Sequence, residues 1–142
     1  MTDYMKEPLS ELLNRISAKH IVGAADVEGI RKRLYASGDI DREKADFLFA
    51  INDAVSGKDN APGWAELFVE ALTDHVLNDK TTAGEVDDIE AAYLIQKINN
   101  DGQVDPVEVA LLVNIMAQAK VVCQRFRNFA MAWTRKCHRE NI

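Results

Sequence analysis

The fold of this chain is decided by the stretch Gly84-Glu85-Val86-Asp87-Asp88-Ile89-Glu90, whose pattern returns as Gly102-Gln103-Val104-Asp105-Pro106-Val107-Glu108. In both copies an aliphatic residue stands two positions after the glycine, an aspartate follows it directly, and a glutamate stands three positions after the aspartate. A third copy, Gly38-Asp39-Ile40-Asp41-Arg42-Glu43-Lys44, has lysine in place of the glutamate. One local structure is therefore expected three times.

This pattern is typical of the start of a helix. Glycine allows the positive φ of an abrupt turn, after which the aliphatic residue enters the core. The aspartate oxygen accepts a hydrogen bond from the first helical turn, and a glutamate three residues later completes a capping box. We predict helices that begin at Asp41, Asp87 and Asp105, with Pro106 at a first helical position that suits it. Lys44 leaves the first cap half built.

The same spacing also matches the second half of a calcium loop of the EF-hand type, with glycine at position 6, an aliphatic residue at 8 and glutamate at 12. Calcium or magnesium would then be bound by Asp79, Asp87, Glu90, Asp101, Asp105 and Glu108. Ala83 and Lys97, however, stand where this loop needs oxygen ligands, and a hard divalent ion takes six or more oxygens. We favour capped helices without an ion and keep a divalent-cation sensor or buffer as the alternative.

Apolar residues recur at helical spacing along the whole chain, which has 142 residues, 47% of them hydrophobic and 28% charged. This spacing predicts further helices over 8–19, over about 63–77 and after Asp26, which we expect to cap the second helix. The predicted fold class is all-α, a single bundle of six or seven helices with a long C-terminal helix. A domain over 1–142 is large enough to bury a core, which we expect over 9–119, followed by an amphipathic basic helix over 120–139.

The C-terminal third carries one continuous helical pattern. From Asp105 onward apolar residues recur every three or four positions, and neither glycine nor proline interrupts them after Pro106. Either one helix of about 34 residues forms, or a bend near 118–120 divides it in two. The aromatic stripe Phe126, Phe129 and Trp133 is too large to remain in water. We expect it to fold back over the core, with binding of a protein partner or a homodimer through this helix as the alternative.

Charge is divided unevenly along the chain. Residues 120–142 hold six basic side chains and one acidic, whereas residues 1–119 hold 11 basic and 22 acidic. An acidic body repels phosphate, so general nucleic-acid binding is not expected, although the basic tail could meet an acidic surface. No stretch approaches the ~20 apolar residues of a membrane span, and the N-terminus lacks the apolar core of a signal peptide. We therefore expect a cytoplasmic protein.

The sequence shows no local signature of catalysis. No serine, histidine and aspartate stand in a known catalytic spacing, and no glycine-rich phosphate loop is present. His75 follows the apolar stripe of Trp64 and Phe68, where a histidine is most often hydrogen-bonded at the edge of a core. An enzyme whose site joins His75 to acids of another helix is the remaining alternative. The favoured prediction is a non-enzymatic helical interaction or adaptor module.

The two acidic elements also carry a resemblance. Gly84 to Glu90 and Asp101 to Glu108, in an all-helical chain, resemble the TerB-like tellurite-resistance family over roughly residues 38–119. Together with the segment Trp64 to Leu72, they are also similar to bacterial proteins with repeated EF-hand-like helix pairs. The resemblance implies acidic elements that take part in metal binding, and a bacterial stress-response or adaptor role. Two copies depart from the family's Ala-Asp-Gly lead-in, because Ala83 precedes Gly84 and Ser37 precedes Gly38 where aspartate is usual.

Overall fold

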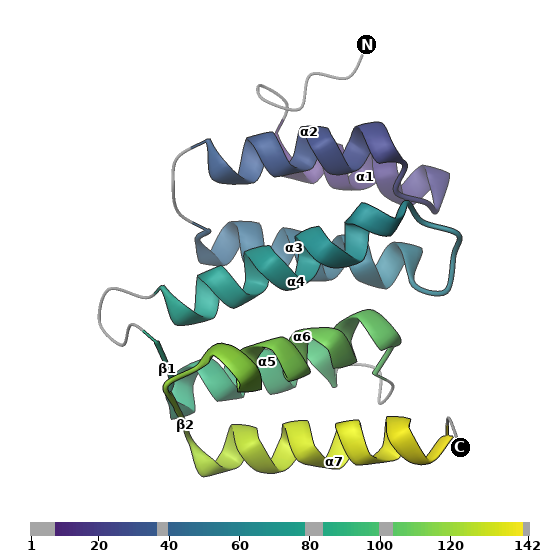
Figure 1. Ribbon diagram of the computed structural model, residues 1–142. Coiled ribbons are helices and arrows are strands. Elements are labelled where there is room, and N and C mark those ends of the chain that lie inside the picture. Colours follow the sequence, from purple (N-terminus) through teal and green to yellow (C-terminus); the bar gives the residue numbers. More distant parts are fainter. Residues whose placement is uncertain (1–7, 37–39, 79–83, 100–103, 141–142) are drawn as a thin grey trace. The chain divides into compact units, whose positions relative to one another are not determined.

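Helices account for most of the residues described by the structure, a computed structural model that covers 8–36, 40–78, 84–99 and 104–140 (Figure 1). Within these ranges the helices are α1 (Leu9–Lys19), α2 (Ala24–Tyr35), α3 (Arg42–Val55), α4 (Pro62–Leu77), α5 (Asp88–Ile98), α6 (Pro106–Gln118) and α7 (Gln124–Glu140). The strands found there, β1 (Glu85–Val86) and β2 (Val121–Val122), have two residues each. The all-α prediction is confirmed.

Three of the helices begin at the aspartates of the repeated pattern, as predicted. Asp41 Oδ1 accepts a hydrogen bond from the Lys44 N–H at 2.9 Å, and no side chain returns it. Asp87 and Asp105 each accept from the N–H three residues later at 2.8 Å, and Glu90 and Glu108 accept from the N–H of the aspartates. The two complete capping boxes therefore lie in α5 and α6, and the half-built cap lies in α3.

Gly84 is needed for the turn into β1. Its φ of +79° lies in the left-handed region, and a Cβ there would meet the Lys120 side chain at 3.2 Å. Its N–H donates to the Leu77 carbonyl at 2.6 Å. The positive φ predicted for the glycine is confirmed in this copy. The other two glycines of the pattern, at 38 and 102, lie outside the described residues.

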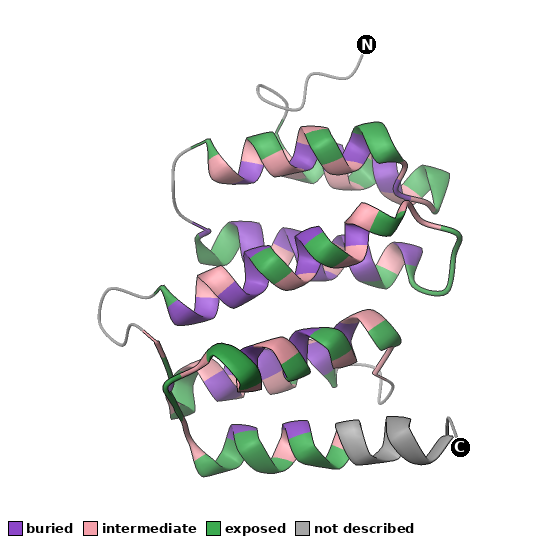
Figure 2. Ribbon diagram, viewed as in Figure 1, coloured by how far each residue is buried: buried purple, intermediate pink, exposed green. Residues whose placement is uncertain are grey.

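The chain divides into two compact units, Met1–His75 and Val76–Ile142, called unit 1 and unit 2 below. In unit 1, α1 packs against α3. The Trp64, Phe68 and Phe49 rings lie next to one another in the core, with the Phe49 and Phe68 ring centres 5.5 Å apart and edge to face. Each unit buries its own apolar residues (Figure 2), and the expected single domain over 1–142, with its core over 9–119, stays a prediction.

In unit 2, α7 packs against both α5 and α6. The short strands β1 and β2 run parallel, with Glu85 beside Val121 and Val86 beside Val122. Phe126 and Ala130 of α7 are buried, so the buried residues continue past residue 119. The expectation that the aromatic stripe folds back over the core is confirmed for Phe126.

A single long C-terminal helix is not present in the described residues, and the alternative of a bend near 118–120 is the one observed. α6 ends at Gln118, and Ala119 has the extended angles φ −67° and ψ 139°. Val121 and Val122 follow, and β-branched residues favour extended backbone. The Lys120 N–H donates to the Gly84 carbonyl at 2.7 Å and the Cys123 N–H to the Val86 carbonyl at 3.0 Å. These backbone bonds to a distant segment override the helical pattern.

The predicted cap at Asp26 is also corrected. α2 begins at Ala24, after Gly23, and Asp26 is the third residue of the helix. Its Oδ2 accepts the Gly23 N–H at 3.0 Å from inside the first turn. Asp26 therefore performs the task that Glu90 and Glu108 perform in α5 and α6, whereas Gly23 occupies the cap position without a side chain.

Candidate functional site

The predicted metal-binding residues fall into two separate pairs, and each pair is engaged at the start of its own helix. Asp87 and Glu90 form the capping box of α5, and Asp105 and Glu108 form that of α6. Glu108 is also buried, with 4% of its surface exposed. The remaining two predicted ligands, Asp79 and Asp101, lie outside the described residues.

The described carboxylates do not assemble into a metal centre. Among these residues, no group of three or more histidine, cysteine, aspartate or glutamate side chains could hold a metal ion. Calcium takes six to eight oxygen ligands, and magnesium needs a near-octahedral set. Each capping aspartate already directs Oδ1 to a backbone N–H, so a cation would compete with the helix cap. The divalent-cation hypothesis stays a prediction.

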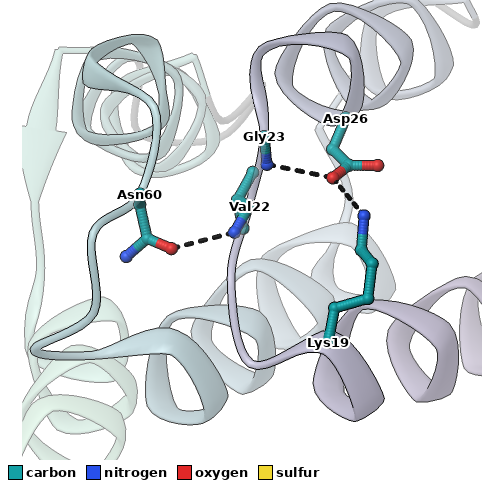
Figure 3. Close-up of polar contacts among 5 residues, drawn as sticks. All are labelled: Lys19, Val22, Gly23, Asp26 and Asn60. Carbon is teal, nitrogen blue, oxygen red and sulfur yellow. Dashed lines mark hydrogen bonds and ion pairs between the residues drawn. The ribbon is translucent and has the colours of Figure 1, made fainter.

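A polar cluster in unit 1 joins the α1–α2 turn to the loop before α4 (Figure 3). Asp26 Oδ2 accepts from Lys19 Nζ at 2.6 Å as well as from the Gly23 N–H. Asn60 Oδ1 accepts from the Val22 N–H at 2.9 Å, and Asn60 Nδ2 donates to the Val55 carbonyl at 2.8 Å. Side-chain hydrogen bonds therefore connect the loop to the turn, and this cluster stabilises the fold of unit 1.

A second set of polar contacts joins α2 to α4. Arg31 pairs with Glu70 at 2.6 Å, and the Tyr35 hydroxyl donates to Asp74 Oδ2 at 2.7 Å. Burial, followed by the hydrogen bond to the Asp74 carboxylate, raises the pKa of Tyr35 well above its ordinary value of 10.0. The hydroxyl is therefore held as a hydrogen-bond donor and is unsuited to give up its proton.

His75, the histidine of the enzyme alternative, makes a hydrogen bond to the backbone. Its Nδ1 lies 2.6 Å from the Ile40 carbonyl oxygen. A carbonyl oxygen only accepts, so Nδ1 carries the proton in this contact. The prediction of a histidine hydrogen-bonded at the edge of the core is confirmed, because His75 is half-buried and bonds to backbone.

Lys44 is buried, and sequence reasoning missed its role. Its Nζ donates to the Leu34 carbonyl at 2.8 Å, in the last turn of α2. Only 9% of the residue is exposed. The lysine that leaves the α3 cap half built thus satisfies a carbonyl at the end of the preceding helix. A glutamate could not do this, since a carboxylate only accepts hydrogen bonds.

The strongly exposed large apolar residues among those described all lie in unit 2. They are Ile89 (76% exposed), Val121 (55%), Val113 (51%) and Met131 (41%), called the exposed apolar set below. The predicted partner-binding stripe differs from it, because Phe126 is fully buried and Phe129 and Trp133 are half-buried. Only those last two of the three predicted residues are partly accessible.

Phase along the helix could have identified Ile89 of the exposed apolar set. In α5 the most deeply buried residues, Ala91, Leu94 and Ile98, share one face, whereas Tyr93, which is 9% exposed, stands four positions after Ile89. Ile89 stands two positions before Ala91. A shift of two residues is about 200° on a helix, which places Ile89 on the opposite side. An aliphatic residue out of phase with its own core stripe was the available signal.

Charge in unit 2 is segregated although its total is close to zero. Residues 76–119 contain two basic and eight acidic side chains, and residues 120–142 contain six basic and one acidic. Arg125 and Arg127 of α7 are exposed, and so is Glu85 beside Val121. The exposed apolar set is thus accompanied by both signs of charge.

No helix in the described part of the chain combines the length and hydropathy needed to cross a membrane. The resemblance to the TerB-like family stays a prediction. Comparison of the chain with known protein families, with characterised proteins and with solved structures finds no match.

Proposed function

We propose that this protein is a non-enzymatic helical interaction module, an adaptor whose unit 2 binds a protein partner. The observation that supports the proposal most directly is the location of the exposed apolar set: its four members lie in unit 2, and unit 1 has no equivalent among its described residues. Single exposed apolar residues are ordinary on protein surfaces. Their concentration in one unit is what favours a binding role.

Burial of these side chains would contribute to the binding free energy. Burying one aliphatic side chain completely is worth roughly 1.5–3 kcal/mol, so two or three such anchors contribute a useful part of a micromolar affinity. Arg125 and Arg127 are exposed on α7, four and six residues after Val121. A partner with apolar anchors and an acidic rim would complement this surface, because opposite charges at a rim guide association.

The use made of polar groups elsewhere also favours an adaptor over an enzyme. His75 donates to a backbone carbonyl, and Tyr35 is held as a donor to Asp74. Lys44 and Asp26 are committed to the ends of helices. The titratable groups partly buried in unit 1 therefore stabilise its fold.

The test places the same charge at two equivalent positions. Ile89 is the second residue of α5, and Ala25 is the exposed second residue of α2, so Ile89→Asp and Ala25→Asp are matched in helix position and charge. Aspartate is favourable in a first turn, and both variants should therefore fold. Wild type and variants would be used as baits in affinity enrichment with quantitative mass spectrometry, and enriched proteins would then be purified and titrated.

The proposal expects one protein that wild type and Ala25→Asp enrich equally and that Ile89→Asp loses. The purified partner should bind Ile89→Asp at least about ten-fold more weakly, in line with the loss of one buried aliphatic anchor. Equal binding of every enriched protein by folded Ile89→Asp and folded Val121→Asp would contradict the proposal.

A further inference from the structure

The helical pattern of the C-terminal third runs through the break between α6 and α7. Apolar residues stand at 112, 115, 119, 122, 126, 129 and 133, which is an unbroken alternation of three and four, and no glycine or proline follows Pro106. A sequence with this pattern favours one helix. The structure instead interrupts it over Ala119–Cys123.

Backbone bonds to β1 and the residues beside it hold the interruption in the described part of the chain. The Lys120 N–H bonds to Gly84 and the Cys123 N–H to Val86, beside the two-residue pairing of β1 with β2. The Ala119 N–H still donates to the Ile115 carbonyl, so the helical pattern of bonds reaches the first residue of the break. In a continuous helix each N–H of the break would find the carbonyl four residues earlier. Because α6 already supplies the nucleus, extension adds one hydrogen bond for each residue fixed.

Straightening the break would separate α7 from the surface that it covers. Phe126 and Ala130 are buried where α7 packs against α5 and α6. The surface on α5 and α6 is shaped for α7, so a second copy of the same helix fits it with every contact retained. Exchange of an identical element between protomers is a low-cost route to a dimer for this reason.

Charge favours the same occupant. Residues 76–119 carry a net charge of −6 and residues 120–142 a net charge of +5. When two copies exchange α7, each basic helix again meets an acidic body, and both attractions are kept. A second copy is thus complementary in shape and in charge.

The geometry points to a domain-swapped homodimer of this chain, in which α6 and α7 join into one continuous helix and each α7 packs on α5 and α6 of the other copy. The interruption over Ala119–Cys123 is then the hinge. This inference goes beyond the proposed function, since its surface is the buried side of α7 rather than the exposed apolar set.

The experiment uses a proline that the monomer accepts and the continuous helix rejects. Gln124 is the first residue of α7, where proline is favoured, and only Cys123, which lies outside the helix, separates it from the extended residues of β2. Inside a continuous helix the same proline removes a hydrogen bond and clashes with the preceding turn. Gln124→Ala is the control, because it loses the Gln124 to Asn128 side-chain bond and keeps a helix-forming residue.

Each protein would be refolded at high concentration under reducing conditions and sized by chromatography with light scattering. Wild type and Gln124→Ala should form a dimer fraction, and Gln124→Pro should weaken dimerisation by at least about 100-fold, the cost of one proline in a helix interior. Val121→Leu with Val122→Leu, which favours the helix, should raise the dimer fraction several-fold. Circular dichroism of the dimers should show added helix.

Three results would overturn the inference. The first is a dimer that Gln124→Pro leaves unchanged. The second is a double leucine variant that stays monomeric at millimolar concentration. The third is a dimer abolished by Ile89→Asp and kept by Gln124→Pro, which would place the interface on the exposed apolar set and would favour the proposed binding surface instead.

Discussion

The two units differ in the polar side-chain contacts that stabilise their helices. In unit 1, polar side chains cross between elements, as Arg31 does to Glu70, Tyr35 to Asp74 and Lys44 to the end of α2. In unit 2 the two capping boxes lie within single helices. Contacts between elements determine how helices pack, whereas caps determine only where a helix begins. The described contacts that join elements of unit 2 include the packing of α7 on α5 and α6 and the short β1–β2 pairing.

The largest expected effect tests the core of unit 1. Trp64 is 1% exposed, packs beside Phe68 and donates its Nε1–H to Asn52 Oδ1 at 3.1 Å. Trp64→Ala should lower the free energy of unfolding by about 3–5 kcal/mol, because a large cavity forms and a buried acceptor loses its donor. Denaturant unfolding followed by circular dichroism measures this change. Ile89→Ala is the control and should alter the free energy of unfolding by less than about 0.5 kcal/mol. If Trp64→Ala lowered the free energy of unfolding by no more than this, Trp64 would not be a core residue of unit 1.

The next prediction sharpens the contrast between a cap and a contact that joins two helices. Lys44→Glu would complete the repeated sequence pattern in α3, yet it should destabilise the protein by about 2 kcal/mol or more. The new carboxylate would face the Leu34 carbonyl in a buried site, and two acceptors cannot bond. Lys44→Met, which keeps the apolar stem, should cost less, about 1–2 kcal/mol. If thermal and denaturant unfolding instead found Lys44→Glu more stable than wild type, the completed capping box of α3 would contribute more to stability than the Lys44 bond to the Leu34 carbonyl.

A third prediction separates caps from cation ligands in unit 2. Asp105→Ala should cost about 1 kcal/mol, whereas Asp105→Asn should be near neutral, since asparagine caps helices as well as aspartate. Asparagine, however, removes a charge that calcium or magnesium would require. Calorimetric titration with both ions therefore decides between the two interpretations. Binding heat that wild type shows and Asp105→Asn abolishes would favour the cation sensor. Equal binding heat from the two proteins would mean that Asp105 acts as a helix cap and not as a cation ligand.

The smallest expected effect is the pH dependence carried by Tyr35 in unit 1. Its pKa is raised above 10.0 in the folded protein, so between its unfolded and folded pKa values the unfolded chain loses a proton that the folded chain keeps. The stabilisation is fully present below pH 10 and should decline as the pH rises above 10. Tyr35→Phe should flatten this decline and cost less than about 1 kcal/mol at neutral pH. Unfolding measured in both proteins across this range provides the check, and parallel curves would exclude Tyr35 as the cause.

Much of the secondary structure was accessible from local chemistry. Helix starts at Asp41, Asp87 and Asp105 depend on residues within one turn, so the pattern of glycine, aliphatic residue and aspartate sufficed. The predicted cap at Asp26 lies three residues after the observed cap at Gly23, because an acid at the third helical position also bonds within the first turn and there accepts the N–H of the cap residue. Local patterns of this kind find the helix and leave its first residue ambiguous.

The candidate surface was less accessible. The aromatic stripe suggested a binding site at Phe126, Phe129 and Trp133, but Phe126 is buried in the core. The exposed apolar set escaped notice because Ile89 and Val113 stand beside core positions in the sequence and are separated from them only by helical phase. Burial depends on what packs opposite a residue, which a single sequence does not state.

The sequence by itself determined most of the helices and the caps at Asp41, Asp87 and Asp105, because the bonds that start a helix join residues three or four positions apart. Only the tertiary structure decided that the uniform pattern after Asp105 is interrupted at Ala119, that Lys44 serves the end of α2, and that Phe126 is buried. Each of these depends on a partner far away in the chain, such as Gly84 for Lys120 or Leu34 for Lys44. Such partners meet only after the chain has folded, and their backbone bonds and burial then outweigh the local preference for helix.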